Sequence, residues 1–167
     1  MKKEFYQRKI NDIITKCPIE AGVEILVYRL LDECIDDTKL SLVDINRIWK
    51  NQDERLITDG GVPDIAVLSN DFVFKDTDKG KCYGFVEVKS TEISLRETEK
   101  FLGESKNVEH FIYTNGLVWK YYKGNKLEKE YNLIKGKKLP YSISPVEIDE
   151  HEFIELQSFI KTIKWNN

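Results

Sequence analysis

The chain has 167 residues, of which 41% are hydrophobic and 33% are charged, and its net charge is −3 at pH 7. This balance excludes an intrinsically disordered chain, and the length suits one globular domain, so residues 1–167 are expected to form a single domain. The slight negative charge argues against a protein whose whole surface grips nucleic acid. No apolar run approaches the length that spans a membrane, so no membrane partner is expected.

The three cysteines, Cys17, Cys34 and Cys82, have no CxxC spacing, and neither histidine has a cysteine at ligand spacing. A disulfide framework and a zinc site are therefore not expected. The first nine residues contain lysines but no apolar stretch after them, which excludes a signal peptide. Together these features predict a protein of the reducing cytoplasm.

The first part of the chain predicts three helices. Residues 4–15 have the pattern of a short helix, and after Pro18 residues 19–35 have the clearest helical pattern, with one apolar stripe. A further helix is expected over residues 42–50, with Ser41 as its N-cap.

The rest of the chain predicts a sheet with helices between and after its strands. Strands are expected at residues 62–68 (with 71–73 extending this edge), 83–89, 111–113, 117–122 and 126–133, and helices at 90–105 and 150–164. Asn115-Gly116 is the strongest hairpin signal in the chain. The expected fold class is α/β, with a central mixed β-sheet flanked by helices.

Two short stretches carry the chemistry: GGVPDIAVL at residues 60–68 and YGFVEVKST at residues 83–91. They place Asp64, Glu87 and Lys89 on strand-like segments. Glu87 and Lys89 are two residues apart, so their side chains leave the same face of the strand. Two acids and a lysine at one place are what a divalent metal ion and an attacking water need, which predicts a metal-dependent phosphodiesterase.

Asp64 and the triplet Glu87-x-Lys89 resemble the PD-(D/E)xK nuclease superfamily. The chain most resembles the N-terminal nuclease domain of type I restriction enzyme R subunits, in which the E-x-K strand leads through a helix to a hairpin that reads TNG-x-W. The corresponding segment here is FIYTNGLVWKYY at residues 111–122, and the resemblance extends over residues 20–122. It implies a restriction endonuclease-like core and Mg²⁺-dependent cleavage of DNA.

Mg²⁺ prefers hard oxygen ligands, so the carboxylates of Asp64 and Glu87 are expected to hold it, with Mn²⁺ as an alternative ion. The resemblance implies that the carbonyl of Val88 is a further ligand. Lys89 is expected to hold the attacking water or to stabilise the charge that develops on phosphorus.

A glutamate from the first core helix often joins the metal site in this superfamily. Glu20 lies inside the apolar stripe of the helix over residues 19–35 and is expected to take this catalytic place, with Glu24 one turn on as the alternative. A carboxylate on that side needs a partner. The other interpretation of Glu20 is a favourable interaction with the helix dipole after Pro18.

The chain departs from the R-subunit pattern in the helix after the E-x-K strand. That helix tends to carry a glutamine in R subunits, whereas TEISLRETEKFLGES has none. Arg96, Glu99 or Lys100 is expected to face the site instead. The departure keeps open a catalytically weak or inactive nuclease-fold module.

A charge cluster suggests where nucleic acid binds. Residues 120–138 carry seven lysines against two glutamates, and such an asymmetric surface can hold a polyanion. Lys120 and Lys123 are expected phosphate contacts, as are Ser90 and Thr91 directly after the triplet. The alternative is a lysine-rich hairpin that is simply solvated and resists edge-to-edge pairing.

Three functions follow from these observations. The first is a Mg²⁺-dependent endonuclease that cuts DNA in a restriction-like system. It is expected to act by itself, as a homodimer or with partner subunits of such a system. The second is an inactive module of the same fold that binds nucleic acid or a protein. The third is a Holliday junction resolvase, which the EVKS run also fits.

Overall fold

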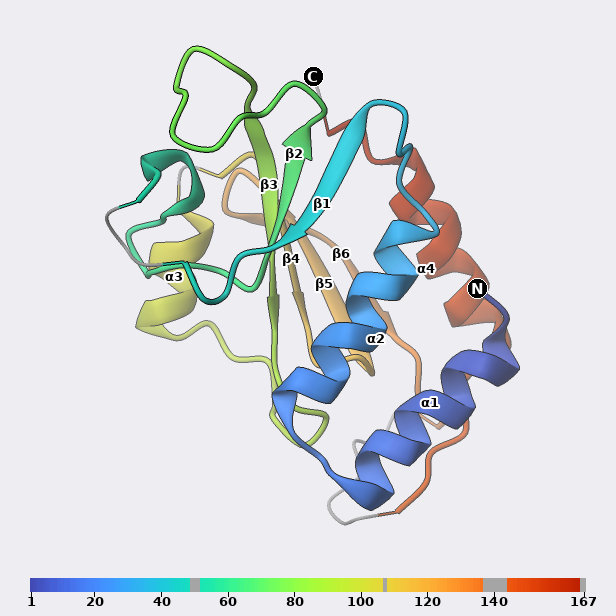
Figure 1. Ribbon diagram of the computed structural model, residues 1–167. Coiled ribbons are helices and arrows are strands. Elements are labelled where there is room, and N and C mark those ends of the chain that lie inside the picture. Colours follow the sequence, from blue (N-terminus) through green and yellow to red (C-terminus); the bar gives the residue numbers. More distant parts are fainter. Residues whose placement is uncertain (49–51, 107, 137–143, 166–167) are drawn as a thin grey trace.

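The computed structural model describes residues 1–48, 52–106, 108–136 and 144–165 (Figure 1). Its helices are α1 (Lys3–Lys16), α2 (Glu20–Asp32), α3 (Glu99–Ser105) and α4 (Glu150–Thr162), with a 3₁₀ turn at Glu54–Leu56. Its strands are β1 (Leu40–Asp44), β2 (Ile65–Ser69), β3 (Cys82–Val88), β4 (His110–Thr114), β5 (Val118–Lys123) and β6 (Lys126–Asn132). None of the helices in these ranges is long and apolar enough to cross a membrane.

The six strands form one sheet in the order β1-β2-β3-β4-β5-β6. Neighbouring strands are antiparallel except β3 and β4, which are parallel. A parallel pair needs a long crossover, and residues 89–109, which include α3, supply it. The predicted α/β class, with a central mixed sheet flanked by helices, is confirmed.

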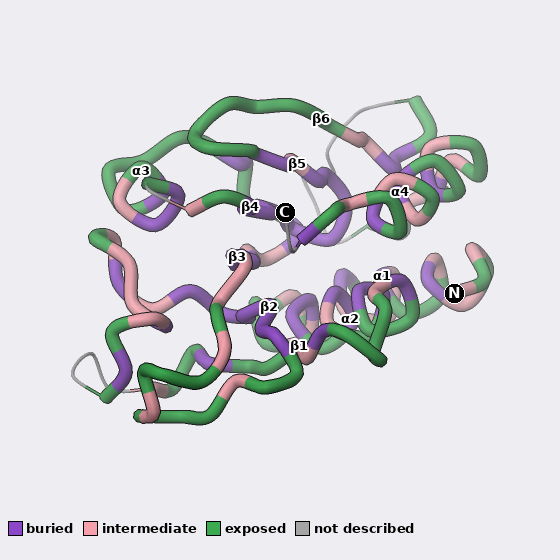
Figure 2. Tube along the Cα trace, turned by 90° about the horizontal axis from the view of Figure 1, so that it is seen from above, coloured by how far each residue is buried: buried purple, intermediate pink, exposed green. Residues whose placement is uncertain are grey.

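Helices α1, α2 and α4 pack against one face of the sheet, and α3 lies against the other (Figures 1 and 2). The apolar stripe predicted for α2 supplies Val23, Val27 and Leu30 to the first core, where they meet Val86 and Val88 of β3. Burial of such a stripe stabilises a helix of this length more than its intrinsic propensity does.

Phe101 of α3 is the centre of the second core. Its ring lies 5.7 Å from the ring of Phe111, 5.0 Å from that of Tyr113 and 4.9 Å from that of Tyr122, measured between centroids. Because side chains alternate along a strand, Glu87 points to this α3 side of the sheet while its neighbours in β3 point to the other. The crossover helix therefore lies over the face that carries Glu87.

The predicted hairpin between β4 and β5 is present at Asn115-Gly116. Gly116 has a φ of 79°, in the left-handed region that favours glycine. The Asn115 side chain accepts hydrogen bonds from the backbone N–H groups of Leu117 (3.0 Å) and Val118 (2.7 Å), and its amide donates to the carbonyl of Ile93 at 2.9 Å. The hairpin thereby holds the segment that follows the E-x-K strand.

The helix predicted over residues 42–50 is wrong. Residues 40–44 form β1, which pairs with β2, and the last two residues of the predicted helix lie outside the described part of the chain. Leu40 and Leu42 are buried, whereas Ser41 between them is half-buried. Burial therefore alternates with a period of two residues, as in a strand, and pairing with β2 decides the structure of this segment.

The helix predicted over residues 90–105 is present only in its last turns. It begins at Glu99, where the Thr98 hydroxyl accepts a hydrogen bond from the Phe101 N–H at 3.2 Å. The residues before it form turns and loop. The strand extension expected at residues 71–73 is also wrong, because these residues belong to the turns of the β2–β3 connection.

Candidate active site

Asp64 stands directly before β2, where β2 and β3 meet. Ile65 pairs with Val86 in the antiparallel register, so Asp64 lies across from Glu87. The backbone N–H of Val88 donates a hydrogen bond of 2.6 Å to Oδ2 of Asp64. The structure thus brings together two acids that are 23 positions apart in the sequence.

Glu87 and Lys89 lie at the end of β3, on the same side of the sheet. Glu87 is 1% exposed. The Lys89 ammonium donates hydrogen bonds to Oε1 of Glu87 and, at 2.9 Å, to the carbonyl of Val88. Oε2 of Glu87 is buried and has no hydrogen-bond partner among the described residues. Asp64, Glu87, Val88 and Lys89 therefore form one cluster.

The two glutamates considered on α2 take different places. The Glu20 side chain is 47% exposed rather than part of the apolar stripe, and its Oε2 lies 3.6 Å from the Lys89 ammonium. Glu24 is 8% exposed and accepts two hydrogen bonds from the Asn46 amide, at 2.9 and 3.0 Å. Burial raises the pKa of Glu24, the charge of Asp44 adds to this, and the bond from Asn46 opposes it. Glu20 reaches the cluster through Lys89, and Glu24 is the buried acid of the helix.

Helix α3 brings two further charged side chains to Glu87. The Lys100 ammonium donates a 2.7 Å hydrogen bond to Oε1 of Glu87 and lies 3.0 Å from Oε1 of Glu104. Of the three residues expected to face the site in place of a glutamine, Lys100 is the one that contacts Glu87, whereas Arg96 and Glu99 are exposed.

The sequence reasoning missed Glu104. Its carboxylate is fully buried, and neither oxygen has a hydrogen-bond partner in the part of the chain that the structure describes. The spacing Lys100-x-x-x-Glu104 places both side chains on one face of a helix, so the signal was present. The spacing alone does not show which face of the helix meets the sheet, so Glu104 was not singled out.

The electrostatics of the cluster follow from burial. Burial and, next, the charge of Glu87 raise the pKa of Asp64 to about 7, although the Val88 N–H and Lys89 oppose this. The same two causes raise the pKa of Glu104 to about 7, against the opposing effect of Lys100. Burial lowers the pKa of Lys89, but its hydrogen bond to Glu87 and the charge there raise it overall. Burial also lowers the pKa of Lys100, and its hydrogen bond to Glu87 and the charge there raise that pKa overall.

The donor set suits a small divalent cation that keeps part of its water shell. Among the described residues, no group of three or more His, Cys, Asp or Glu side chains is arranged to hold a metal ion. Mg²⁺, however, is commonly bound by one or two carboxylates together with water and substrate oxygens. Asp64, Glu87 and the Val88 carbonyl provide such a set, and Oε2 of Glu87 is a buried acceptor without a partner.

The charges of the cluster point the same way. Three buried carboxylates, those of Asp64, Glu87 and Glu104, stand against the two ammonium groups of the lysines. When all are ionised, these side chains have one negative charge in excess, and the half-exposed Glu20 adds another at the solvent side. A buried excess of negative charge is costly, and a divalent cation offsets it.

The side chains expected to bind DNA do not gather at one place. Ser90 is half-buried and Thr91 is 2% exposed, so the Thr91 side chain is covered. Lys120 lies beside Tyr113, the neighbour of Glu87 in β4, and its ammonium donates to the Leu95 carbonyl at 3.3 Å.

Lys123 is exposed and lies across from His110, at the opposite end of β4 from the cluster. Lys120 is therefore on the side of the candidate site, and Lys123 is remote from it.

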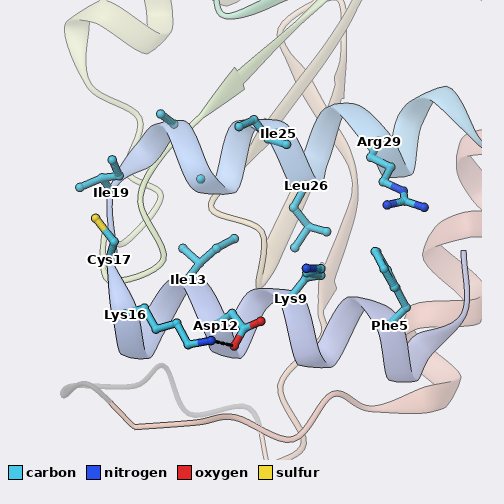
Figure 3. Close-up of a pocket in the computed structure, with 12 residues that line it drawn as sticks. Phe5, Lys9, Asp12, Ile13, Lys16, Cys17, Ile19, Ile25, Leu26 and Arg29 are labelled. Atoms are coloured by element: carbon cyan, nitrogen blue, oxygen red, sulfur yellow. Dashed lines mark hydrogen bonds and ion pairs between the residues drawn. The ribbon is translucent and has the colours of Figure 1, made fainter.

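A groove of about 640 Å³ lies between α1 and α2 (Figure 3). Its lining includes Ile13, Ile25 and Leu26, with Lys9 and Arg29 beside them. None of the acids or lysines of the cluster lines this groove. Its apolar lining suits contact with another molecule rather than phosphoryl chemistry.

The fold and the cluster define an α/β protein with an acid–lysine site at the end of its central strand. The structure is similar to a chain of the DrdV–DNA complex determined by cryo-electron microscopy, with a TM-score of 0.61 and 13% sequence identity. The similarity covers 96% of this chain and 95% of the other. No protein-family model matches the sequence, and the comparison with curated proteins gave no match. At this identity the likeness shows a shared fold.

Proposed function

We propose that this protein is a nuclease of the PD-(D/E)xK type, which hydrolyses phosphodiester bonds of DNA with Mg²⁺ or Mn²⁺. The observation that carries the proposal is the position of Asp64. Its carboxylate is fixed by the Val88 N–H beside the buried carboxylate of Glu87, and Lys89 donates a hydrogen bond to Glu87. Two acids, a backbone carbonyl and a lysine are the groups that metal-assisted phosphodiester hydrolysis needs.

The residues of the site have separate tasks in this proposal. Asp64 and Glu87, with the Val88 carbonyl, hold the cation, which when bound lowers the pKa of the attacking water and offsets charge on the phosphate. Lys89 donates hydrogen bonds to the attacking water or to a phosphate oxygen. Glu20, which is exposed and lies 3.6 Å from Lys89, keeps that ammonium oriented toward the substrate.

The hydrolysis balances without any further reactant. The water oxygen forms a new bond to phosphorus, and the bond between phosphorus and one sugar oxygen breaks. The water loses a proton to solvent, and the leaving sugar oxygen takes up a proton. No residue of the chain becomes covalently modified, so turnover needs only water and the cation.

DNA is the proposed substrate for two reasons. The fold is similar to that of a chain from a complex of DrdV with DNA. Two lysines beside the cluster, the exposed Lys100 and the half-buried Lys120, are placed to neutralise a polyanion as it approaches.

The direct test is cleavage of supercoiled plasmid, linear duplex and a four-way junction with Mg²⁺ or Mn²⁺. Asp64→Asn, Glu87→Gln and Lys89→Met are expected to lower the cleavage rate by about 10²–10³-fold or more, as the loss of an electrostatic group at a reacting centre commonly does. Lys129→Met, an exposed lysine on β6, is the matched control and should cleave like the wild type. Cleavage by all three site variants at the wild-type rate would reject the assignment.

One observation favours a second candidate, an inactive module of the same fold. Two ammonium groups already lie on Oε1 of Glu87, so the carboxylate has cationic partners without a metal. Under this candidate, calorimetric titration with Mn²⁺ shows no binding and DNA stays intact. Binding of Mn²⁺ that Asp64→Asn abolishes would decide for the nuclease.

A further inference from the structure

We propose that Lys100 is a second phosphate-binding ammonium of the candidate active site, and that Glu104 is the residue that positions it. In this proposal Lys100 donates a hydrogen bond from Nζ to a non-bridging oxygen of the scissile phosphate. The inference rests on the proposed nuclease function and assigns to α3 a part in it.

The Lys100 ammonium is within reach of the reacting centre. It lies 2.7 Å from Oε1 of Glu87, the same oxygen that Lys89 contacts, so both ammonium groups converge on one carboxylate. The Lys100 side chain is nevertheless 53% exposed, whereas the Lys89 side chain is 21% exposed. Lys100 therefore faces the solvent side of the cluster, from which a nucleic acid would approach.

Neutralising Glu87 does not require Lys100. Lys89 is already paired with that carboxylate and, at 3.6 Å, with Glu20. A lysine ammonium has three N–H donors. Lys100 donates a hydrogen bond to Glu87 and forms an ion pair with Glu104, so at least one donor is available to a ligand.

Glu104 and the packing of α3 fix where this ammonium lies. Glu104 is one helical turn from Lys100, so its buried carboxylate sits beneath the ammonium at 3.0 Å. The helix is held on its other side by Phe101, which packs among three aromatic rings. The position of Lys100 is thus set by a buried acid and by core packing rather than by surface contacts.

The turn before Asp64 also holds α3. A Cβ atom at Gly60 would collide with the carbonyl oxygen of Lys100 and would lie 2.6 Å from the backbone nitrogen of Glu104. A Cβ at Gly103 would in turn lie 2.6 Å from the nitrogen of Gly60. Two glycines in contact bring the backbone of α3 against the segment that leads to Asp64, so Lys100 and Glu104 are packed against the segment that carries this acid.

The bland alternative is that Lys100 serves only as the counter-ion of the buried Glu104. The two roles separate in a double variant. If Lys100 only compensates Glu104, then Lys100→Met combined with Glu104→Gln removes both charges and restores behaviour like the wild type. If Lys100 binds phosphate, the double variant stays impaired.

The experiment measures binding of a fluorescein-labelled DNA duplex by anisotropy over a range of salt concentrations, with Ca²⁺ as the hard cation. Loss of one phosphate contact lowers the slope of log K against log salt by about 0.9 for a duplex. We expect this decrease for Lys100→Met and for the double variant, together with a fall in kcat in Mg²⁺ of about 10²-fold or more. Lys106→Met, on the same end of the crossover and 57% exposed, is the matched control and should change neither quantity.

Glu104→Gln alone tests the positioning role. It keeps the shape of the side chain and retains the charge of Lys100, so the salt slope should stay as in the wild type. Because the ammonium is positioned less well, kcat should fall while KM changes little. If the kcat of this variant and its pH profile are the same as in the wild type, the positioning role of Glu104 is overturned. Thermal melts of each variant verify that the fold is intact.

The outcomes separate this inference from the proposed function. An unchanged salt slope in Lys100→Met, or a double variant that recovers, overturns the role of Lys100 even if the wild type cleaves DNA. Failure of the wild type to cleave any DNA overturns the nuclease function, while the salt slope still reports whether Lys100 contacts phosphate. Failure of the wild type to bind DNA overturns both.

Discussion

The carboxylate of Asp64 and the backbone N–H of Val88 are joined by a hydrogen bond of 2.6 Å across the end of the β2–β3 pair. The side chain takes the place that a strand carbonyl would otherwise hold, so the last donor of β3 stays satisfied. It also holds one acid against another, because Val88 directly follows Glu87. The bond therefore stabilises the end of the sheet and at the same time holds the carboxylate of Asp64 beside that of Glu87.

The first prediction concerns this bond. Asp64→Asn keeps an oxygen that can accept from Val88 but removes the charge beside Glu87. We expect a folded protein whose affinity for Mn²⁺ falls by about 10–100-fold or more, since such affinities respond this strongly even to residues around the ligands. Calorimetric titration measures it. Asp12→Asn, an exposed acid paired with Lys16, is the control and should bind Mn²⁺ like the wild type; equal affinity in Asp64→Asn would contradict the prediction.

The second prediction is that the metal-free protein loses stability as pH rises from about 5 to about 7. Asp64 and Glu104 have pKa values of about 7 in the folded protein, above the ordinary values near 4 of the unfolded chain. The folded state thus binds more protons in this window, so the free energy of unfolding falls with pH until both groups are ionised.

Urea unfolding in EDTA at several pH values measures this dependence. Glu104→Gln should become more stable than the wild type as pH rises, by about 1–3 kcal/mol at pH 8. Glu128→Gln, at an exposed position of β6, should follow the wild-type curve at every pH. A difference between Glu104→Gln and the wild type that does not vary with pH would contradict the assignment.

The third prediction is that Mg²⁺ or Mn²⁺ reverses this loss at pH 8. A cation that binds only the folded state adds free energy of unfolding, about 2.7 kcal/mol at a concentration one hundred times its Kd. Thermal melts with and without the cation should show an increase in Tm for the wild type and none for Glu87→Gln. An equal increase in both proteins would mean that the cation binds elsewhere.

The fourth prediction concerns the contact of Gly60 with α3. Gly60→Ala places a methyl group against the backbone of Lys100 and Glu104, which cannot move aside as a side chain tip can. We expect a loss of about 1–3 kcal/mol in the free energy of unfolding, in the range of overpacking, together with reduced cleavage.

Gly22→Ala is the matched control for this substitution. A Cβ at Gly22 would meet the Ile13 side chain at 3.4 Å, which is close but yielding, and alanine favours the helix by about 1 kcal/mol. Chemical denaturation should show opposite effects for the two glycines. A neutral result for Gly60→Ala would mean that α3 is not fixed by this turn.

The sequence was sufficient where local patterns and the tertiary fold agree. The alternation around Glu87 and Lys89 predicted the faces of β3, and Asn115-Gly116 predicted the hairpin that the structure contains. The convergence of Asp64 on Glu87 followed from treating their segments as neighbouring strands, which the β2–β3 register confirms.

The sequence was insufficient where a distant partner decides. Leu40 and Leu42 became strand residues because β2 offers them a sheet edge. Glu20 is exposed because it is the first residue of α2, whereas Glu24, one turn on, is buried and bonded to Asn46. Glu104 was missed because its spacing from Lys100 does not show which face of the helix meets Glu87, and the packing of α3 against Gly60 depends on a segment far away in the sequence.

The parallel step between β3 and β4 has a consequence for how this site can vary. Lys89 opens the crossover that this step requires, and Lys100 and Glu104 stand in its second half. The residues between them form turns and loop, outside the ladder of the sheet. Changes of length there would alter which side chains α3 places above Glu87, and their cost would fall on the contacts of α3 and its loop rather than on the strand pairings. The crossover is thus a separately adjustable half of the site, through which related chains can diverge in chemistry while keeping one scaffold.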